Sequence, residues 1–194
     1  LGQPVFAIRM FGEELQKFCD KVGSMLETLP GAVASRDAAA LKALQGDCAQ
    51  VEAAEVELAN YAVELLSAGA TSERQAAEIT DLMSIVDAVG RIGSRCGEVA
   101  GLYGENLASK KPFSDEAREE LAESAAMVSE MYDAVLRFLS DQDAASEQVL
   151  DERRRAIIKR QSKARKAHFR RVSSRQCAPE NKAVYNQLLL GLER

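Results

Sequence analysis

The stretch from Ile79 to Tyr103 carries two sets of regularly spaced residues that constrain how this chain folds. Apolar residues recur at alternating steps of three and four, which lines one face of a long helix. These residues are Leu82, Ile85, Val89, Ile92, Cys96, Val99 and Tyr103. A row of glycines runs beside them at steps of three or four: Gly90, Gly93, Gly97, Gly101 and Gly104. Each glycine costs roughly 0.5–1 kcal/mol relative to alanine inside a helix, so we expect a neighbouring helix or a ligand to approach the bare backbone.

Helical spacing predicts two further helices before this stretch. The first begins at Pro4, and the Pro30-Gly31 pair is expected to stop it. Ser35 is expected to cap the second helix, which ends at Gly69. The second helix places four glutamates largely on its outward face: Glu52, Glu55, Glu57 and Glu64.

Three more helices follow from the same spacing and from capping residues. Ser72 and Gln75 form a capping box that starts the central helix, which runs to about residue 109. Ser114 caps a fourth helix that extends to about residue 139, and residues 140–145 form a short turn. A fifth helix then runs to about residue 173, and a sixth begins at Pro179.

The chain contains an internal repeat. Sliding the sequence by 103 residues places Leu82 on Tyr185, Ile85 on Leu188 and Val89 on Leu192. The first two helices fall on the fourth and fifth by the same shift. The sequence therefore predicts an all-α fold of two tandem three-helix bundles, residues 1–109 and 110–194, with the second repeat truncated in its last helix.

Charge is strongly segregated along the chain. Residues 1–152 hold 12 Lys/Arg and 28 Asp/Glu, whereas residues 153–175 hold 11 Lys/Arg, no acid and the only histidine, His168. A nucleic-acid site is disfavoured because Phe169 is the only aromatic of the basic segment and the rest of the chain would repel a duplex. Two alternatives remain. The basic side chains pair with acids of the first, second and fourth helices, or they contact an anionic membrane leaflet for about 1 kcal/mol each.

Composition is typical of a soluble globular protein, with 46% apolar and 28% charged residues, and no run of about 18 apolar residues could span a bilayer. Because the chain opens on Leu1, we expect it to be a piece of a longer protein. Its four scattered cysteines are expected to be reduced thiols, mostly buried. No nucleophile pairs recognisably with His168, so we predict a hydrogen-bonded helix histidine and no enzymatic activity.

Two segments resemble a known family. Ile85–Ala100, IVDAVGRIGSRCGEVA, resembles the helix that carries the Asp-Leu-Glu-Arg-Ile-Gly-Asp-His signature of PhoU-like proteins. Arg165–Arg194 is similar to the histidine-arginine helix, Cys-x-Pro turn and Leu-Glu-Arg helix of the PhoU-like domain that follows the membrane part of bacterial sodium/phosphate cotransporters. The opening Pro4-Val5-Phe6-Ala7 resembles the start of that domain. The resemblance implies two three-helix bundles on the cytoplasmic side of a transporter.

The resemblance also implies where a metal would bind. Acid-xxx-Asp motifs of PhoU proteins place two acids one turn apart on a helix, where their charge needs a cation. Gly90 and Ser94 occupy the matching positions of the first motif here, whereas Glu193 keeps the acid of the second. Asp87, one turn before Gly90, and Glu193 are therefore the candidate metal ligands. We predict no cofactor, with a divalent or iron-type metal as the alternative.

The leading functional hypothesis is a PhoU-like regulatory domain on the cytoplasmic side of the inner membrane, part of a larger sodium-dependent phosphate cotransporter. It would modulate phosphate uptake by contact with the membrane-spanning part of its own transporter. One alternative is a stand-alone, metal-binding PhoU-type regulator of phosphate signalling and ABC phosphate transport, and another is a dimerisation module that forms a homodimer. The candidate partner-binding residues are Arg165, His168, Arg171, Gly97 and Gly101.

Overall fold

The computed structural model describes residues 3–68, 72–141 and 144–193, and these residues form helices without any strand. The prediction of an all-α fold is confirmed. The helices are α1 (Gln3–Ser35), α2 (Ala38–Ser67), α3 (Glu73–Ala108), α4 (Asp115–Asp141), α5 (Ala144–Ser173) and α6 (Asn181–Glu193).

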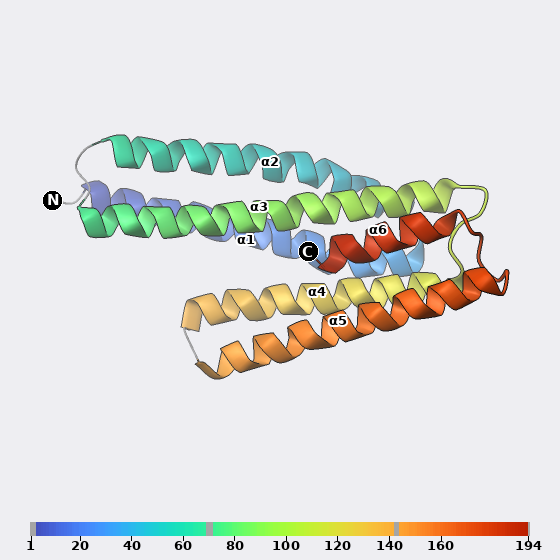
Figure 1. The fold of residues 1–194 in the computed structure, drawn as a ribbon. Helices are drawn as coiled ribbons and strands as arrows, with labels where there is room; N and C mark the ends of the chain where they lie inside the picture. Colours follow the sequence, from blue (N-terminus) through green and yellow to red (C-terminus); the bar gives the residue numbers. More distant parts are fainter. Residues whose placement is uncertain (1–2, 69–71, 142–143, 194) are drawn as a thin grey trace.

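The helices lie in two neighbouring groups that share one hydrophobic core. α1, α2 and α3 pack together, α4 and α5 lie beside one another, and the short α6 lies along part of α3 (Figure 1). α1 also packs against α4, where the Tyr132 hydroxyl donates a hydrogen bond of 2.7 Å to the Cys19 carbonyl. Residues of all six helices belong to one buried cluster. The core therefore continues across the boundary predicted between residues 109 and 110.

α1 does not stop at Pro30-Gly31, as the sequence predicted, but continues to Ser35. Proline removes one backbone donor from the helix. Ala32 and Val33, which follow it, are both buried in the core. Burial of these side chains offsets the loss of one helical hydrogen bond, so the helix runs through the proline.

The cap of α2 is Asp37 rather than the predicted Ser35. Arg36 adopts a left-handed conformation with φ of 57°, and the Asp37 amide donates to the Ala32 carbonyl at 3.0 Å. This bonding closes α1. The Asp37 carboxylate then accepts a hydrogen bond of 3.0 Å from the Ala40 amide and starts α2. The predicted end of α2 at Gly69 lies outside the described residues.

The capping box predicted for α3 is confirmed, because Ser72 and Gln75 each bond to the other's backbone amide. At its far end, two buried asparagines fasten the helix to the rest of the fold. Asn106 donates to Asn181 at 3.0 Å and accepts from the Phe113 amide at 2.9 Å. These bonds join the end of α3, the following loop and the start of α6.

The remaining helix boundaries differ modestly from the predicted ones. Ser114 precedes α4 as predicted, and its hydroxyl accepts from the Ala117 amide at 3.3 Å. The turn predicted over residues 140–145 is shorter, since α4 runs to Asp141 and α5 begins at Ala144. α6 begins at Asn181 rather than at Pro179.

The glycine row of α3 faces α2 of the same chain. A β-carbon placed at Gly97 would lie 2.6 Å from the Cβ atom of Cys48, and one placed at Gly93 would lie 2.8 Å from Val51. Glu55 and Gln45 lie equally close over Gly90 and Gly101. The expected close approach of a helix is therefore found within the chain, where α2 occupies the space that side chains would fill. Gly104 differs, because nothing lies within 4 Å of its β-carbon position.

Gly97→Ala should destabilise the protein by about 1–3 kcal/mol, because the Cys48 Cβ atom moves only with the α2 backbone. Gly104→Ala is the matched control in the same helix and should stabilise by about 0.5–1 kcal/mol. Urea unfolding followed by circular dichroism measures both changes. A Gly97→Ala variant as stable as the parent would show that α2 does not depend on this contact.

Candidate functional site

The two candidate metal ligands do not lie in a metal-binding cluster. Asp87 is exposed on α3, and Glu193 on α6 forms an ion pair with Arg165. Within the described ranges, no group of three or more His, Cys, Asp or Glu side chains is placed to hold a metal ion. Among the described residues, Asp87 and Glu193 therefore lie on different helices, and neither belongs to such a group.

A carboxylate from α2 lies over Gly90, one of the two positions where the motif of the resembled family has an acid and this chain has none. Glu55 was predicted to point largely outward, but it is half-buried against the bare backbone of Gly90. Burial raises the pKa of this carboxyl, and the nearby Asp87 raises it further, whereas Arg91 lowers it. Ser94 is the other position at which the resembled motif has an acid. Its backbone carbonyl accepts a hydrogen bond of 3.9 Å from the Cys48 thiol. Side chains of α2 therefore cover both positions, a carboxylate at Gly90 and a thiol at Ser94.

The cysteines are free thiols, as predicted. Cys19, Cys96 and Cys177 are buried, and Cys48 is half-buried between α2 and α3. Burial raises the pKa of the Cys96 thiol to about 12, so it stays protonated at neutral pH.

The basic residues of α5 form ion pairs mainly with α4. Arg153 pairs with Glu130, Arg160 with Glu123 and Arg171 with Glu120; Arg165 pairs with Glu193 of α6. The predicted pairing with the fourth helix is confirmed. The predicted pairing with the first and second helices is wrong for the described residues, because α5 packs against α4 and α6 and does not contact α1 or α2.

One of these ion pairs is shielded from water and extends into a network. Arg171 donates two hydrogen bonds to the Glu120 carboxylate, at 3.1 and 2.6 Å. The Tyr185 hydroxyl of α6 donates to the same carboxylate at 2.6 Å. Arg171 and Glu120 side chains are only 13% and 14% exposed. The bidentate geometry and the third donor compensate for desolvation, so the network holds α4, α5 and α6 in register.

His168 lies beside this network without a hydrogen bond, contrary to the prediction. It is 1% exposed, and neither ring nitrogen has a partner. Its ring instead stacks on Tyr185, with centroids 4.0 Å apart, and meets Phe113 edge-on. Burial, and secondarily the charge of Arg171, lower its pKa to about 4. His168 is therefore neutral at pH 7.

Two other buried polar side chains, one on α4 and one on α5, also have no hydrogen-bond partner. Gln161 of α5 and Ser124 of α4 are fully buried, and no hydrogen bond reaches the Gln161 amide or the Ser124 hydroxyl. The spacing of residues on α5 is a signal that could have identified Gln161 and His168, but not Ser124. Gln161, Ala164 and His168 recur at helical spacing on α5, which places two polar residues on its buried face.

A largely apolar groove of about 760 Å³ opens where α6 ends. α3 contributes Ile85 and Ile92, and α4 contributes Val128 and Val135, all of them only half-buried. The last residues of α6 and the first half of α5 also line the groove: Leu190, Leu192, Glu193, Arg154, Ile157 and Ile158. Figure 1 shows that α6 lies beside only one end of α3, whereas α3, α4 and α5 continue past it.

The predicted partner-binding residues do not form one surface. Gly97 and Gly101 are buried against α2, His168 is buried beside Tyr185, and Arg171 is bound to Glu120. Arg165 is half-buried beside Glu193.

Comparison of the chain with protein-family models, with curated proteins and with solved structures found no match. Among the described residues, none of the helices combines the length and the apolar character needed to cross a bilayer.

Stability should fall as the pH is lowered from 7 to 5. The folded state lowers the pKa of His168 from its ordinary 6.5 to about 4, so the unfolded chain takes up a proton first. The stability conferred by neutral His168 is complete above pH 6.5 and is lost between pH 6.5 and 4, with a loss of about 2 kcal/mol by pH 5. Urea unfolding at each pH measures this.

The control is His168→Phe, which keeps an aromatic ring against Tyr185 but cannot titrate. This variant should lose most of the decline between pH 7 and 5. An equal decline in both proteins would assign the pH dependence to other groups.

Proposed function

We propose that this chain is a PhoU-like regulatory domain on the cytoplasmic side of a sodium-dependent phosphate cotransporter, and that it modulates phosphate uptake through protein contacts. The segments 85–100 and 165–194 support the family assignment by their resemblance. The observation that supports action through protein contact is the apolar groove bounded by α3, α4, α5 and α6.

The groove has the chemistry of a helix-binding site. Ile85 and Ile92 lie two turns apart on one face of α3, and Val128 and Val135 lie two turns apart on one face of α4. Fully burying such a side chain contributes about 1.5–3 kcal/mol relative to exposure, and these residues are only half-buried. An apolar helix face laid along the groove would complete their burial.

The occupant that we propose is a helix of the membrane-spanning part of the same transporter. An apolar face on the part of such a helix that extends beyond the bilayer would match the groove wall, and Arg154 at the groove supplies a positive charge that would pair with an acidic residue of the helix. Binding and release of this helix would couple the packing of the domain to transport.

Substituting serine for both Ile85 and Val135 should change sodium-dependent phosphate uptake by the parent protein as much as deletion of the whole domain does. The two substitutions remove apolar contact from both walls of the groove. Uptake of radiolabelled phosphate by cells that carry the parent protein, with and without sodium, is the measurement.

The matched control replaces Val56 and Val63 with serine. Both are exposed on α2, 59% and 61%, outside the groove. Circular dichroism of each isolated variant checks that the helices still form. Unchanged uptake in a folded groove variant contradicts action through the groove, and unchanged uptake after deletion of the domain contradicts the proposed function itself.

A further inference from the structure

A second groove, of about 480 Å³, lies on a different surface, between α5 and α6. Its lining includes four basic residues, an amide and the histidine: Arg165, Lys166, Arg170, Lys182, Asn186 and His168. Among the residues that the structure describes, the lining contains no carboxylate. The groove therefore presents positive charge together with the amide of Asn186.

Most of this positive charge has no protein counter-ion. Arg165 pairs with Glu193, but Lys166, Arg170 and Lys182 have no carboxylate oxygen within 4.0 Å in the part of the chain that the structure describes. Like charges gathered in one groove repel one another and attract anions. The ammonium of Lys182 lies 4.8 Å from the centre of the Phe169 ring, which holds this charge at the groove.

The remaining lining residues supply neutral hydrogen-bonding groups. His168 is almost fully buried, and both of its ring nitrogens lack a partner. These nitrogens have almost no accessible surface, so the side chains around His168 must shift before an acceptor reaches its N–H, and the new hydrogen bond would then recover part of the cost of burying the group without a partner. The half-buried amide of Asn186 lies on the opposite wall, on α6.

We propose that the groove between α5 and α6 binds a phosphate group. Near neutral pH, inorganic phosphate carries between one and two negative charges and the phosphodiester of a phospholipid carries one. The acceptor oxygens of either group match three cations that have no carboxylate partner and the neutral amide of Asn186. The group comes either from inorganic phosphate or from the headgroup of an anionic phospholipid. The proposed phosphate site lies on a different surface from the apolar groove. The proposal that it binds phosphate does not depend on the proposed function.

The test uses the single histidine as its own reporter. Inorganic phosphate is titrated into the chain at pH 7, with sodium chloride at matched ionic strength as the reference, and the imidazole resonances of His168 are followed by NMR. Burial lowers the pKa of His168 to about 4 in the free protein, whereas a bound anion would raise it, so the imidazole ¹⁵N shifts are recorded to separate contact with phosphate from proton uptake. A second arm measures co-sedimentation with vesicles of phosphatidylglycerol or of phosphatidylcholine.

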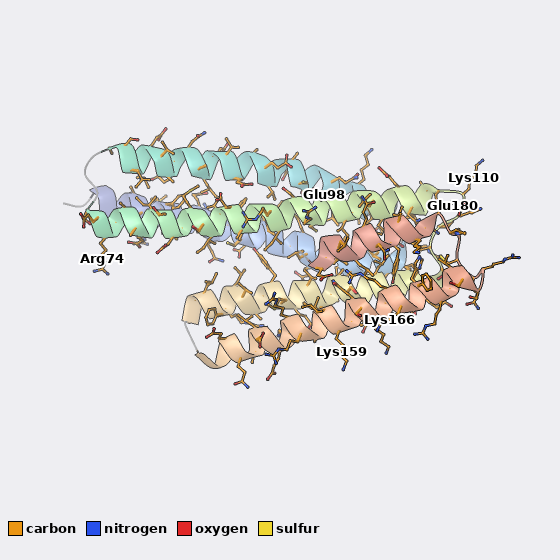
Figure 2. The ribbon with its side chains drawn as sticks, viewed as in Figure 1. Arg74, Glu98, Lys110, Lys159, Lys166 and Glu180 are labelled. Carbon is orange, nitrogen blue, oxygen red and sulfur yellow. The ribbon has the colours of Figure 1, made fainter. Side chains whose placement is uncertain are left out.

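The key variant carries Lys166→Gln, Arg170→Gln and Lys182→Gln. Its control is Lys159→Gln, an exposed lysine of the same helix that does not line the groove; Figure 2 labels Lys159 and Lys166 on α5. We expect the triple variant to bind at least about tenfold more weakly and the control to bind as the parent does.

Saturable binding of inorganic phosphate that the triple variant loses supports the proposal with free phosphate as the source. Binding to phosphatidylglycerol vesicles alone, lost in the same way, supports it with a lipid headgroup as the source. The proposal is overturned if neither probe binds, if the triple variant binds as tightly as the parent, or if Lys159→Gln weakens binding equally.

Discussion

The close contact between α2 and the glycine row of α3 determines how the other helices are arranged. Because α3 has no side chains at Gly93 and Gly97, Val51 and Cys48 of α2 approach its backbone directly. The apolar stripe of α3 is then free to face α1 and α6. A side chain also approaches the bare backbone of a glycine at Gly191 of α6, whose β-carbon position lies 2.8 Å from Val99 of α3. α3 consequently belongs to both helix groups, and one core serves the whole fold.

The two groups differ in what they bury. α1, α2 and α3 pack through apolar side chains, whereas the interface of α4, α5 and α6 contains Glu120, Arg171, His168 and Gln161. Buried polar groups fix the relative positions of the helices that they join. Each one that lacks a hydrogen-bond partner, however, lowers the stability of the fold. The groove between α5 and α6, here called the basic groove, lies next to these buried polar residues and shares His168 with them. Arg165 lines the basic groove and Glu193 lines the apolar groove, so their ion pair stands between the two.

Much of the fold was predictable because it depends on local spacing. The capping box at Ser72, the helical content and the close approach at the glycine row follow from periodicity and from the cost of glycine. The continuation of α1 through Pro30 was not predictable in this way, since burial of Val33 decides it. Ser35 and Asp37 are both good caps, and only the left-handed turn at Arg36 selects the aspartate.

The candidate sites were less predictable than the fold. The apolar groove forms between helices that are distant in sequence, whereas the groove between α5 and α6 forms between consecutive helices. In both cases the spacing of a side chain along its helix does not reveal whether a neighbour covers it. The half-buried state of Ile85 and Val135 depends on where α6 ends relative to α3. The spacing of Gln161 and His168 puts both on the buried face of α5. Whether they find hydrogen-bond partners depends on which side chains of α4 and α6 lie opposite them.

Native-state hydrogen exchange tests most directly whether α3 joins both groups into one cooperative core. If it does, the slowest amides of α1, α3 and α4 exchange with one common free energy, equal to the free energy of global unfolding. Slow amides of α4 and α5 that exchange at a clearly lower free energy than those of α2 and α3 would contradict a shared core, because the second group would then open while the first stayed folded.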